Sequence, residues 1–367
     1  MAPMAQFLPY SAARKLVRDH EVDPQYQKRA RSWLIFSAMT EPLRWYEKLR
    51  WGRRVRATRF EQEPLFLLGF GRSGTTHLHN LMWQDSRFGG VTNYQASMHS
   101  VALMGRNWLP KLLAGQMPKT RPMDNVAISL EGPQEEEMAM MNATHHAPLH
   151  VTSFPREAPE FYDRYVTDLG RDTEATEGWK RAYLEVLQKA TILSEGKRLV
   201  LKTPPNTGRV GVLLDMFPKA RFVNIVRNPY PVYQSMRNMY RKTLPAAVLQ
   251  EIDWEAIDAW ILHAYQVQMQ KYLDQRELIP EGHLIEIRYE ELEAHPMETL
   301  KQIYMTLGLG DYDGQKDRLR TYLESLGGYE KNRFEFPPDV IETVNDHWAF
   351  AFDAFGYERE QVAASGS

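Results

Sequence analysis

The stretch from Pro64 to Met82, PLFLLGFGRSGTTHLHNLM, decides the fold of the chain. Its first apolar residues, Leu65 to Leu68, form a continuous run with no helical period, bounded by a proline and a glycine, which predicts a short buried strand. The glycines that follow allow a tight turn, and Thr75 and Thr76 then open a stretch whose apolar residues have helical spacing. The stretch therefore predicts a strand, a glycine loop and a helix.

Such a loop directs several backbone N–H groups and a helix N-terminus at one point, which makes an anion-binding site without a metal. A plain strand-to-helix turn is the alternative interpretation. The glycine spacing matches the first part of a Walker loop, but Thr75 and Thr76 stand where that motif has Lys and then Ser or Thr. Arg72, inside the loop, carries the charge instead. Because no lysine is placed to reach the β and γ phosphates, the loop argues against a nucleoside triphosphate with Mg²⁺ and predicts a different phosphate donor.

Length and composition limit the classes of protein to which the chain can belong. The 367 residues, 43% of them hydrophobic, are enough for one large domain or two smaller ones with a full core. A formal net charge of −2 argues against a general nucleic-acid binder. The absence of cysteine excludes disulfides, thiol chemistry and zinc sites with Cys ligands.

The N-terminal residues bear on the cellular location of the protein, and the C-terminal residues indicate whether the tail is ordered. The first residues lack the basic and then apolar pattern of a signal peptide, and their longest apolar run, Trp33 to Phe36, is far shorter than the ~20 residues that span a bilayer. We therefore expect a cytoplasmic protein. Residues 358–367 end in the small and polar sequence VAASGS, which is typical of a disordered tail.

Residues 1–60 are predicted to form a helical lead-in, with one helix over about 24–39 and another over about 42–59. Residues 44–60 interleave aromatic with basic side chains. Such a pattern can lie on an anionic membrane surface as a peripheral contact, or it can meet an acidic partner. The alternative, which we favour, is a solvated basic face whose aromatic residues pack on the core.

The segment after the glycine loop is expected to form the pocket for a second substrate, the acceptor. Residues 85–130 are rich in Pro, Gly, Met and Asn, which predicts a loop-rich insertion with short helices that walls an acceptor pocket. The acidic sequence EEEMAMMNATHH follows, and on a continued helix Glu135, Asn142 and His146 would share a face with apolar residues. A carboxylate against an apolar wall has a raised pKa and can act as a base near neutrality. A solvated acidic helix N-terminus is the alternative, and we favour it on these residues alone.

Strand-like runs at 198–201 and 221–226 flank a helix expected over about 207–216. This alternation predicts a βαβ unit in a parallel sheet, which binds ligands at the carboxyl ends of its strands, where Lys202 and Arg227 stand. The remaining elements are expected as helices over 254–276 and 296–326, a strand over 283–288 and a closing helix up to residue 355. We predict a single α/β domain over residues 61–357, with a central parallel sheet of four or five strands flanked by helices.

Four motifs in order resemble landmarks of the sulfotransferase family, which uses 3′-phosphoadenosine-5′-phosphosulfate (PAPS). FGRSGTTHL resembles the family's 5′-phosphosulfate loop, and RNPYPVYQS resembles its 3′-phosphate motif, in which Arg227 and Ser235 stand eight residues apart. LKTPP and RYEELEAHP also resemble family landmarks. Together the matches cover roughly residues 64–357.

The resemblance implies a role for individual residues. The residues it implies for donor binding are Arg72, Ser73, Gly74, Thr75, Thr76, His77, Arg227, Ser235 and Tyr289, with Lys331 and Arg333 as a looser match to a late basic loop. Lys202 would polarise the sulfuryl group together with Arg72. His77 would take the place of an aromatic residue on adenine, and Tyr289 would line the adenine site.

Two departures from the family pattern concern the acceptor base. Cytosolic relatives have a His where this chain has Pro204, and some bacterial relatives have one where it has Asn206. Neither residue can abstract a proton, so the base must lie elsewhere. The acidic segment resembles one in bacterial relatives, which favours Glu135. The further candidates are Glu136, His99 and His146.

The predicted function is sulfuryl transfer from PAPS to the hydroxyl of a small, apolar alcohol or phenol, without a metal and with release of adenosine 3′,5′-bisphosphate. A P-loop phosphotransferase of the kinase type is one alternative, disfavoured by Thr75 in the lysine position. A nucleotide-binding protein without turnover is another, suggested by the missing His. The sequence leaves the oligomeric state open.

Overall fold

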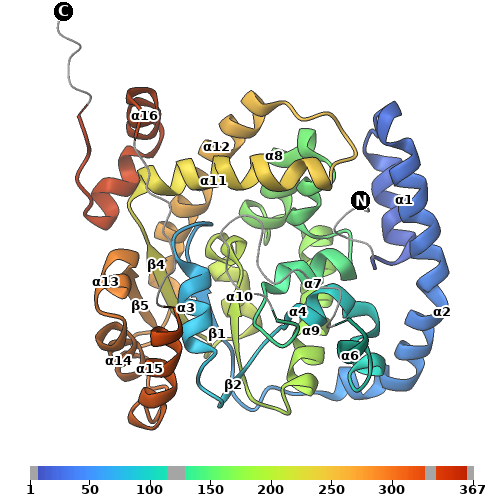
Figure 1. The fold of residues 1–367 in the computed structure, drawn as a ribbon, viewed down its shortest axis with the longest axis horizontal. Helices are drawn as coiled ribbons and strands as arrows, with labels where there is room; N and C mark the ends of the chain where they lie inside the picture. Colours follow the sequence, from blue (N-terminus) through green and yellow to red (C-terminus); the bar gives the residue numbers. More distant parts are fainter. Residues whose placement is uncertain (1–6, 114–128, 327–335, 362–367) are drawn as a thin grey trace, which may run out of the picture.

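The computed structural model describes residues 7–113, 129–326 and 336–361. Its centre is a five-stranded parallel sheet in the order β2-β3-β1-β4-β5 (Figure 1). The strands are β1 Leu65–Leu68, β2 Phe88–Gly89, β3 Arg198–Lys202, β4 Arg221–Val226 and β5 Leu284–Arg288. The predicted α/β class, with a parallel sheet of four or five strands flanked by helices, is therefore confirmed. The two-residue β2 was not predicted, because it is too short to leave a pattern.

The sheet is covered by helices on both faces, which is why β1 is apolar at every position. Leu65 and Leu67 face one buried cluster, which includes side chains of α3 (Thr75–Met82) and α14 (Pro296–Thr306). Phe66 and Leu68 face the other buried cluster. It includes side chains of α9 (Thr173–Leu193), α10 (Val210–Met216) and α12 (Trp254–Gln275). The alternation along one four-residue strand therefore supplies both cores.

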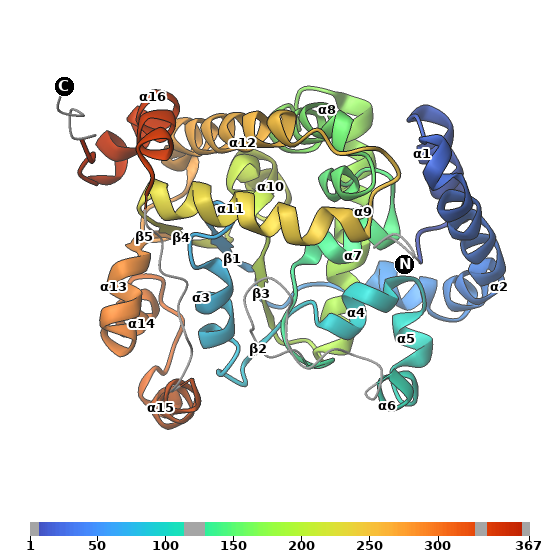
Figure 2. The ribbon, with the colours of Figure 1, turned by 45° about the horizontal axis from the view of Figure 1, so that its top comes forward.

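Most expected helices are present with shifted bounds (Figures 1 and 2). The described α-helices are α1 Tyr10–Asp19, α2 Gln27–Ala57, α3 Thr75–Met82, α4 Asn93–Met98, α5 Ala102–Gly105, α6 Leu109–Leu113, α7 Glu136–Ala143, α8 Ala158–Tyr162, α9 Thr173–Leu193, α10 Val210–Met216, α11 Pro229–Thr243, α12 Trp254–Gln275, α13 Tyr289–Ala294, α14 Pro296–Thr306, α15 Lys316–Ser325 and α16 Pro338–Phe355. The predicted helix over 207–216 begins with the 3-10 segment Pro204–Arg209 before α10.

The N-terminal region differs from the prediction of two helices, because α2 is continuous through Pro42. A proline inside a helix removes a hydrogen bond and costs roughly 3 kcal/mol, so other contacts must hold the helix together there. Arg44, two residues later, is buried and donates to the carbonyl oxygens of Ser37 (2.9 Å) and Leu8 (2.7 Å). These bonds join the middle of α2 to the chain before α1.

The favoured interpretation of residues 44–60 is wrong for its first residues. Arg44 is buried, whereas Trp45 and Tyr46 are exposed to solvent. Phe60 does pack on the core, as expected. Because the helix turns its charged side chain inward, the aromatic side chains beside it are left on the surface.

Among the residues that the structure describes, no helix combines the length and the apolar character that crossing a membrane requires. The cytoplasmic location stays a prediction, as do the domain limits. Lys331 and Arg333 lie outside the described residues, and so do residues 362–367 of the predicted tail.

Candidate active site

The loop between β1 and α3 needs glycine because it packs against two other elements. Gly69 has a φ of 139°, and a Cβ atom there would lie 2.5 Å from the carbonyl oxygen of Ile225 on β4. Gly74, the residue before α3, has a φ of 92°, and a Cβ there would lie 2.2 Å from the ring of Tyr289. Both positions therefore exclude other residues on backbone and steric grounds. The N–H of Gly69 donates to Oγ1 of Thr207 at 2.7 Å, which fixes the start of the loop.

Arg72 links this loop to the motif on α11. It is one of two non-glycine residues with positive φ in the described chain, at 68°, a conformation that is often found at functional sites. Its Nε donates to Oγ of Ser235 at 2.9 Å, and its carbonyl oxygen accepts a hydrogen bond from Arg227 at 3.1 Å. The Arg227 guanidinium lies 4.2 Å from the ring centroid of Tyr289. The loop, α11 and the start of α13 thus meet at one point.

This point carries the properties of an anion site. The N-terminus of α3 opens at Thr75 with Gly74 as its capping residue, so the first backbone N–H groups of the helix are directed toward the loop. Ser73 and Thr75 are buried, and Thr76 and His77 are half-buried. Two guanidinium groups stand beside the same helix end. The arrangement can therefore bind a ligand with more than one anionic group.

Lys202, at the end of β3, joins the loop to the acidic segment. Its Nζ lies 2.5 Å from Oε1 of Glu135 and 3.3 Å from Oγ1 of Thr76. The lysine side chain is almost fully buried, whereas the Glu135 side chain is 24% exposed. Glu135 is therefore a carboxylate that solvent or a ligand can reach, held beside the anion site.

The next two glutamates are buried and have partners in the segment that follows Lys202. Oε1 of Glu136 accepts hydrogen bonds from Asn206 (2.7 Å) and Tyr183 (2.9 Å). Oε2 of Glu137 lies 2.6 Å from an Arg209 nitrogen, and both side chains are completely buried. The favoured solvated acidic terminus is therefore wrong, because three consecutive carboxylates contact one strand end and the 3-10 segment after it.

Burial controls the protonation of this cluster. It raises the pKa of Glu136 to about 7, and the pKa of Glu137 is also raised by burial, against the attraction of Arg209. Oε2 of Glu136 has no hydrogen-bond partner among the described residues. A protonated oxygen at this position avoids a buried, unpaired charge.

Residues 64–313 match the model of the Sulfotransferase family. The chain is 32% identical over 329 residues to the ω-hydroxy-β-dihydromenaquinone-9 sulfotransferase Stf3 of Mycobacterium bovis, a match that covers 89% of this chain and 84% of the relative. The chain belongs to the sulfotransferase family. The prediction of a PAPS-dependent sulfotransferase is thereby confirmed as the enzyme class.

Two solved sulfotransferase structures share the fold. STF9 from Mycobacterium avium has a TM-score of 0.67 at 17% identity and covers 97% of this chain and 98% of its own. STF1 from Mycobacterium tuberculosis has a TM-score of 0.61 at 17% identity, with 93% and 97% covered. The fold prediction is therefore confirmed by whole-chain similarity.

The predicted helix face around Glu135 is not formed in this sulfotransferase. Glu135 has extended backbone angles and precedes α7, which ends at Ala143, so His146 is not on the helix. The ring of His146 instead contacts the rings of His145 and Tyr165. The expected face fails because the chain leaves the helix at Thr144, whose backbone is extended.

His99 is buried at another place in the sulfotransferase. Its carbonyl oxygen accepts a hydrogen bond from Lys189 at 3.1 Å, and burial with this lysine nearby holds the pKa of His99 well below its usual range. The structure thus brings together Glu135, Lys202 and Thr76, a group that does not include His99 or His146.

Sequence reasoning missed the supporting residues Tyr183, Asn206 and Arg209. Asn206 entered only as a missing His, and the other two were not considered. One signal was available, since Asn206 and Arg209 stand three residues apart and so fall on one face of a helical turn. Tyr183 comes from α9, and no sequence pattern links it to the acidic segment.

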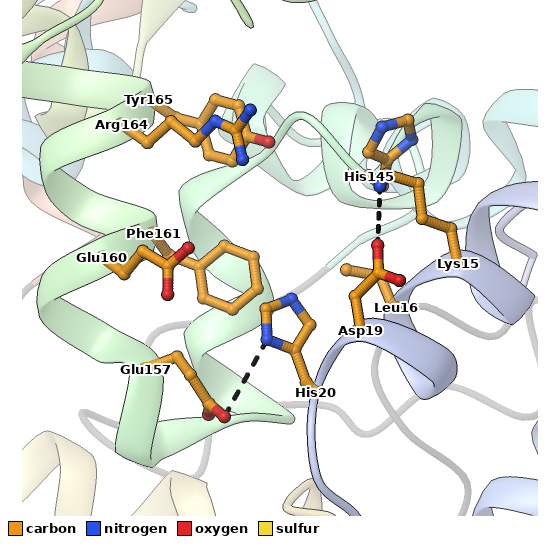
Figure 3. Close-up of a pocket in the computed structure, with 10 residues that line it drawn as sticks. All are labelled: Lys15, Leu16, Asp19, His20, His145, Glu157, Glu160, Phe161, Arg164 and Tyr165. Atoms are coloured by element: carbon orange, nitrogen blue, oxygen red, sulfur yellow. Dashed lines mark hydrogen bonds and ion pairs between the residues drawn. The ribbon is translucent and has the colours of Figure 1, made fainter.

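A cavity of about 230 Å³ lies apart from this site, between α1 and the region of α8 (Figure 3). Two pairs of its polar groups contact one another: Nζ of Lys15 lies 2.6 Å from Asp19, and Nδ1 of His20 lies 3.9 Å from Glu157. Burial lowers the pKa of His145, which also lines it, to about 3, so this imidazole is neutral near pH 7. The lining includes none of the predicted site residues.

Proposed function

We propose that this sulfotransferase moves a sulfuryl group from PAPS to the hydroxyl of an apolar alcohol, with Glu135 as the base. The observation that carries the proposal is the contact between Arg72 and Ser235, with Arg227 bound to the same loop. It joins the loop that resembles a 5′-phosphosulfate site to the motif that resembles a 3′-phosphate site. A donor with both groups needs the two sites side by side.

The anionic groups of the donor fit the residues at this point. The N-terminus of α3, with Arg72 and the Thr75 and Thr76 positions, binds the 5′-phosphosulfate. Arg227 and Ser235 bind the 3′-phosphate. The adenine lies near Tyr289, whose ring already stacks against Arg227, and near His77. These assignments follow the motifs residue by residue.

PAPS supplies the sulfuryl group and leaves as adenosine 3′,5′-bisphosphate. The acceptor oxygen forms a bond to sulfur while the bond between sulfur and the bridging phosphate oxygen breaks. The hydroxyl proton passes to the Glu135 carboxylate, which is the exposed one of the three glutamates. Lys202 stabilises the negative charge that develops on the leaving side, since its ammonium group lies between Glu135 and Thr76.

The buried neighbours of Glu135 position it. Glu136 and Glu137 have no exposed surface, so a substrate cannot touch them without rearrangement. Their bonds to Asn206 and Arg209 hold the start of α7 against the segment that follows Lys202. We assign Glu135 the proton transfer, and Glu136 and Glu137 the placement of the backbone that carries it.

The acceptor is proposed to be an apolar molecule with a terminal hydroxyl. The name of the Stf3 relative gives its acceptor as an ω-hydroxylated dihydromenaquinone, and this chain matches 84% of that relative. A hydroxyl at the end of an isoprenoid chain is an apolar primary alcohol. The phenol of the sequence-based prediction is the competing acceptor class.

A panel of acceptors with sulfur-labelled PAPS tests the proposal. The panel contains an ω-hydroxylated isoprenoid quinol, a long-chain alcohol, a phenol and a sugar. We expect labelled product from the isoprenoid alcohol, with one adenosine 3′,5′-bisphosphate released per sulfate ester formed. Tight nucleotide binding with no labelled product from any acceptor would favour the protein without turnover. Transfer of phosphate from ATP in place of sulfate would favour the P-loop phosphotransferase.

A further inference from the structure

The outward face of α2 is apolar along its middle. Its exposed large side chains recur every three or four residues and so form one stripe along the helix. This apolar stripe consists of Ile35, Met39, Leu43, Tyr46 and Leu49, with Phe36 and Trp45 at its sides. Met39 and Leu49 are 72% and 68% exposed. By the helical rise, the stripe is about 20 Å long.

Along the same middle part of the helix, the opposite face is buried and polar, with Ser37, Thr40, Arg44 and Glu47. Arg44 donates to backbone carbonyls near α1, as described above. Oε1 of Glu47 forms a buried ion pair with Lys189 at 2.8 Å, and its Oε2 accepts hydrogen bonds from the backbone N–H groups of Leu103 and Met104. Turning the helix to bury the stripe would leave these buried charges unpaired, at a high cost. The polar contacts therefore hold the apolar stripe outward.

The charge around the apolar stripe is positive. Exposed basic residues stand at both ends of it: Lys28 and Arg31 before it, and Lys48, Arg50, Arg53 and Arg54 within or after its last turn. The two acidic residues of α2 are both engaged, since Glu41 accepts a hydrogen bond from the Tyr10 N–H and Glu47 is buried with Lys189. The exposed charged residues of α2 beside the stripe are therefore basic. Glu41, an acidic residue beside the stripe, is half-buried.

We infer that α2 docks on an anionic lipid bilayer, with the apolar stripe in the interfacial region and the helix parallel to the surface. An apolar face bordered by Lys and Arg has affinity for anionic lipids, and Trp and Tyr favour the interface. A second copy of the chain is a poorer occupant, because apposed α2 helices would bring like charges together. Helix α2 forms one edge of the molecule in both views, with α1 along part of it (Figures 1 and 2). The inference does not rest on the proposed function.

Vesicle flotation with a matched pair of double variants tests the inference. The test variant is Met39→Glu with Leu49→Glu, on the apolar stripe. The control is Met305→Glu with Leu278→Glu, whose wild-type side chains are 71% and 60% exposed but lie on α14 and before β5. Both pairs place charge on exposed positions, so both variants should keep the thermal midpoint of the wild type.

The wild type and the control should float with phosphatidylglycerol-rich vesicles and not with phosphatidylcholine vesicles. The stripe variant should bind at least about ten-fold more weakly, because two large apolar side chains no longer enter the interface. Equal binding by both double variants would overturn the inference, as would failure of the wild type to bind anionic vesicles. Sedimentation velocity tests the alternative occupant. If the wild type and the control are dimers, the stripe variant is a monomer and none of them binds vesicles, the stripe contacts a second copy of the chain and the inference is overturned. These readouts use no turnover, so they are independent of the acceptor.

Discussion

The loop between β1 and α3 (the donor loop, residues 69–74) and the three glutamates at 135–137 (the acidic segment) lie on either side of Lys202. The two regions differ in the kind of contact that holds their charged side chains. Among the described residues, Arg72 contacts the hydroxyl of Ser235, and Arg227 contacts a backbone carbonyl oxygen and an aromatic ring. In the acidic segment, Glu135 and Glu137 contact cations, and Glu136 contacts polar donors. The first region gathers two guanidinium groups beside a helix N-terminus, whereas the second uses charge pairs to fix its own position.

This difference separates the effects of substitutions. A change in the donor loop should alter nucleotide affinity with little effect on folding. A change in the acidic segment should alter turnover at its exposed member and stability at its buried members.

Removing the base should have the largest effect. Glu135→Gln is expected to lower kcat by at least ~10²-fold, because a positioned base contributes to the transition state, and to leave nucleotide affinity nearly unchanged. Single-turnover kinetics and nucleotide titration measure the two quantities. Glu131→Gln, an exposed residue four positions earlier, is the control and should be active. A near-normal kcat in Glu135→Gln would remove this residue from the mechanism.

Breaking the buried ion pair should reduce stability. Glu137→Gln leaves the fully buried Arg209 without its carboxylate, which is expected to lower the free energy of unfolding by about 3 kcal/mol. The exposed pair of Asp353 and Arg359, at 2.7 Å, is the matched control. Asp353→Asn should cost less than about 1 kcal/mol. Urea unfolding gives both values, and equal losses would contradict the distinction between buried and exposed pairs.

The raised pKa of Glu136 predicts a pH dependence of stability. Glu136 ionises near 4.5 in the unfolded chain and near 7 in the folded one, so between these values only the folded state holds the proton. Stability should therefore fall as pH rises through this window and level off above it. Glu136→Gln keeps the Oε1 acceptor and cannot ionise, so it should gain about 3 kcal/mol relative to the wild type across the window. Urea midpoints between about pH 5 and about pH 8 test this, and parallel curves would refute the buried proton.

Removal of divalent metal should have no effect on activity. Arg72, Arg227 and Lys202 place three cations beside the loop, and Glu135 is already paired with Lys202. Sulfuryl transfer should therefore proceed at the same rate in EDTA. Loss of activity that Mg²⁺ restores would favour the phosphotransferase.

The strand, the glycine loop and the helix that follows it could be predicted from sequence because their determinants are local. Gly69 and Gly74 are required by the turn itself, and Arg227 and Ser235 belong to one short motif. Strands β1, β3, β4 and β5 could also be predicted, because each is a short, mostly apolar run in the sequence. The two-residue β2 could not. Short-range patterns report backbone geometry well.

The acidic segment and α2 could not be predicted because their burial depends on distant partners. Glu136 is held by Tyr183, 47 residues away, and Glu47 by Lys189, 142 residues away. A charged residue without such a partner belongs on the surface, and this was the basis for both wrong interpretations. Once Arg44 and Glu47 are paired inside, the helix must expose its apolar side.

Calorimetry of nucleotide binding tests most directly whether the loop and α11 form a single donor site. Adenosine 3′,5′-bisphosphate should bind at least about ten-fold more tightly than AMP, because Arg227 and Ser235 make charge-assisted hydrogen bonds to the 3′-phosphate. Arg227→Ala should abolish most of this difference, and Arg241→Ala, on the last turn of the same helix, should retain it. Equal affinity of the wild type for the two nucleotides would contradict the account.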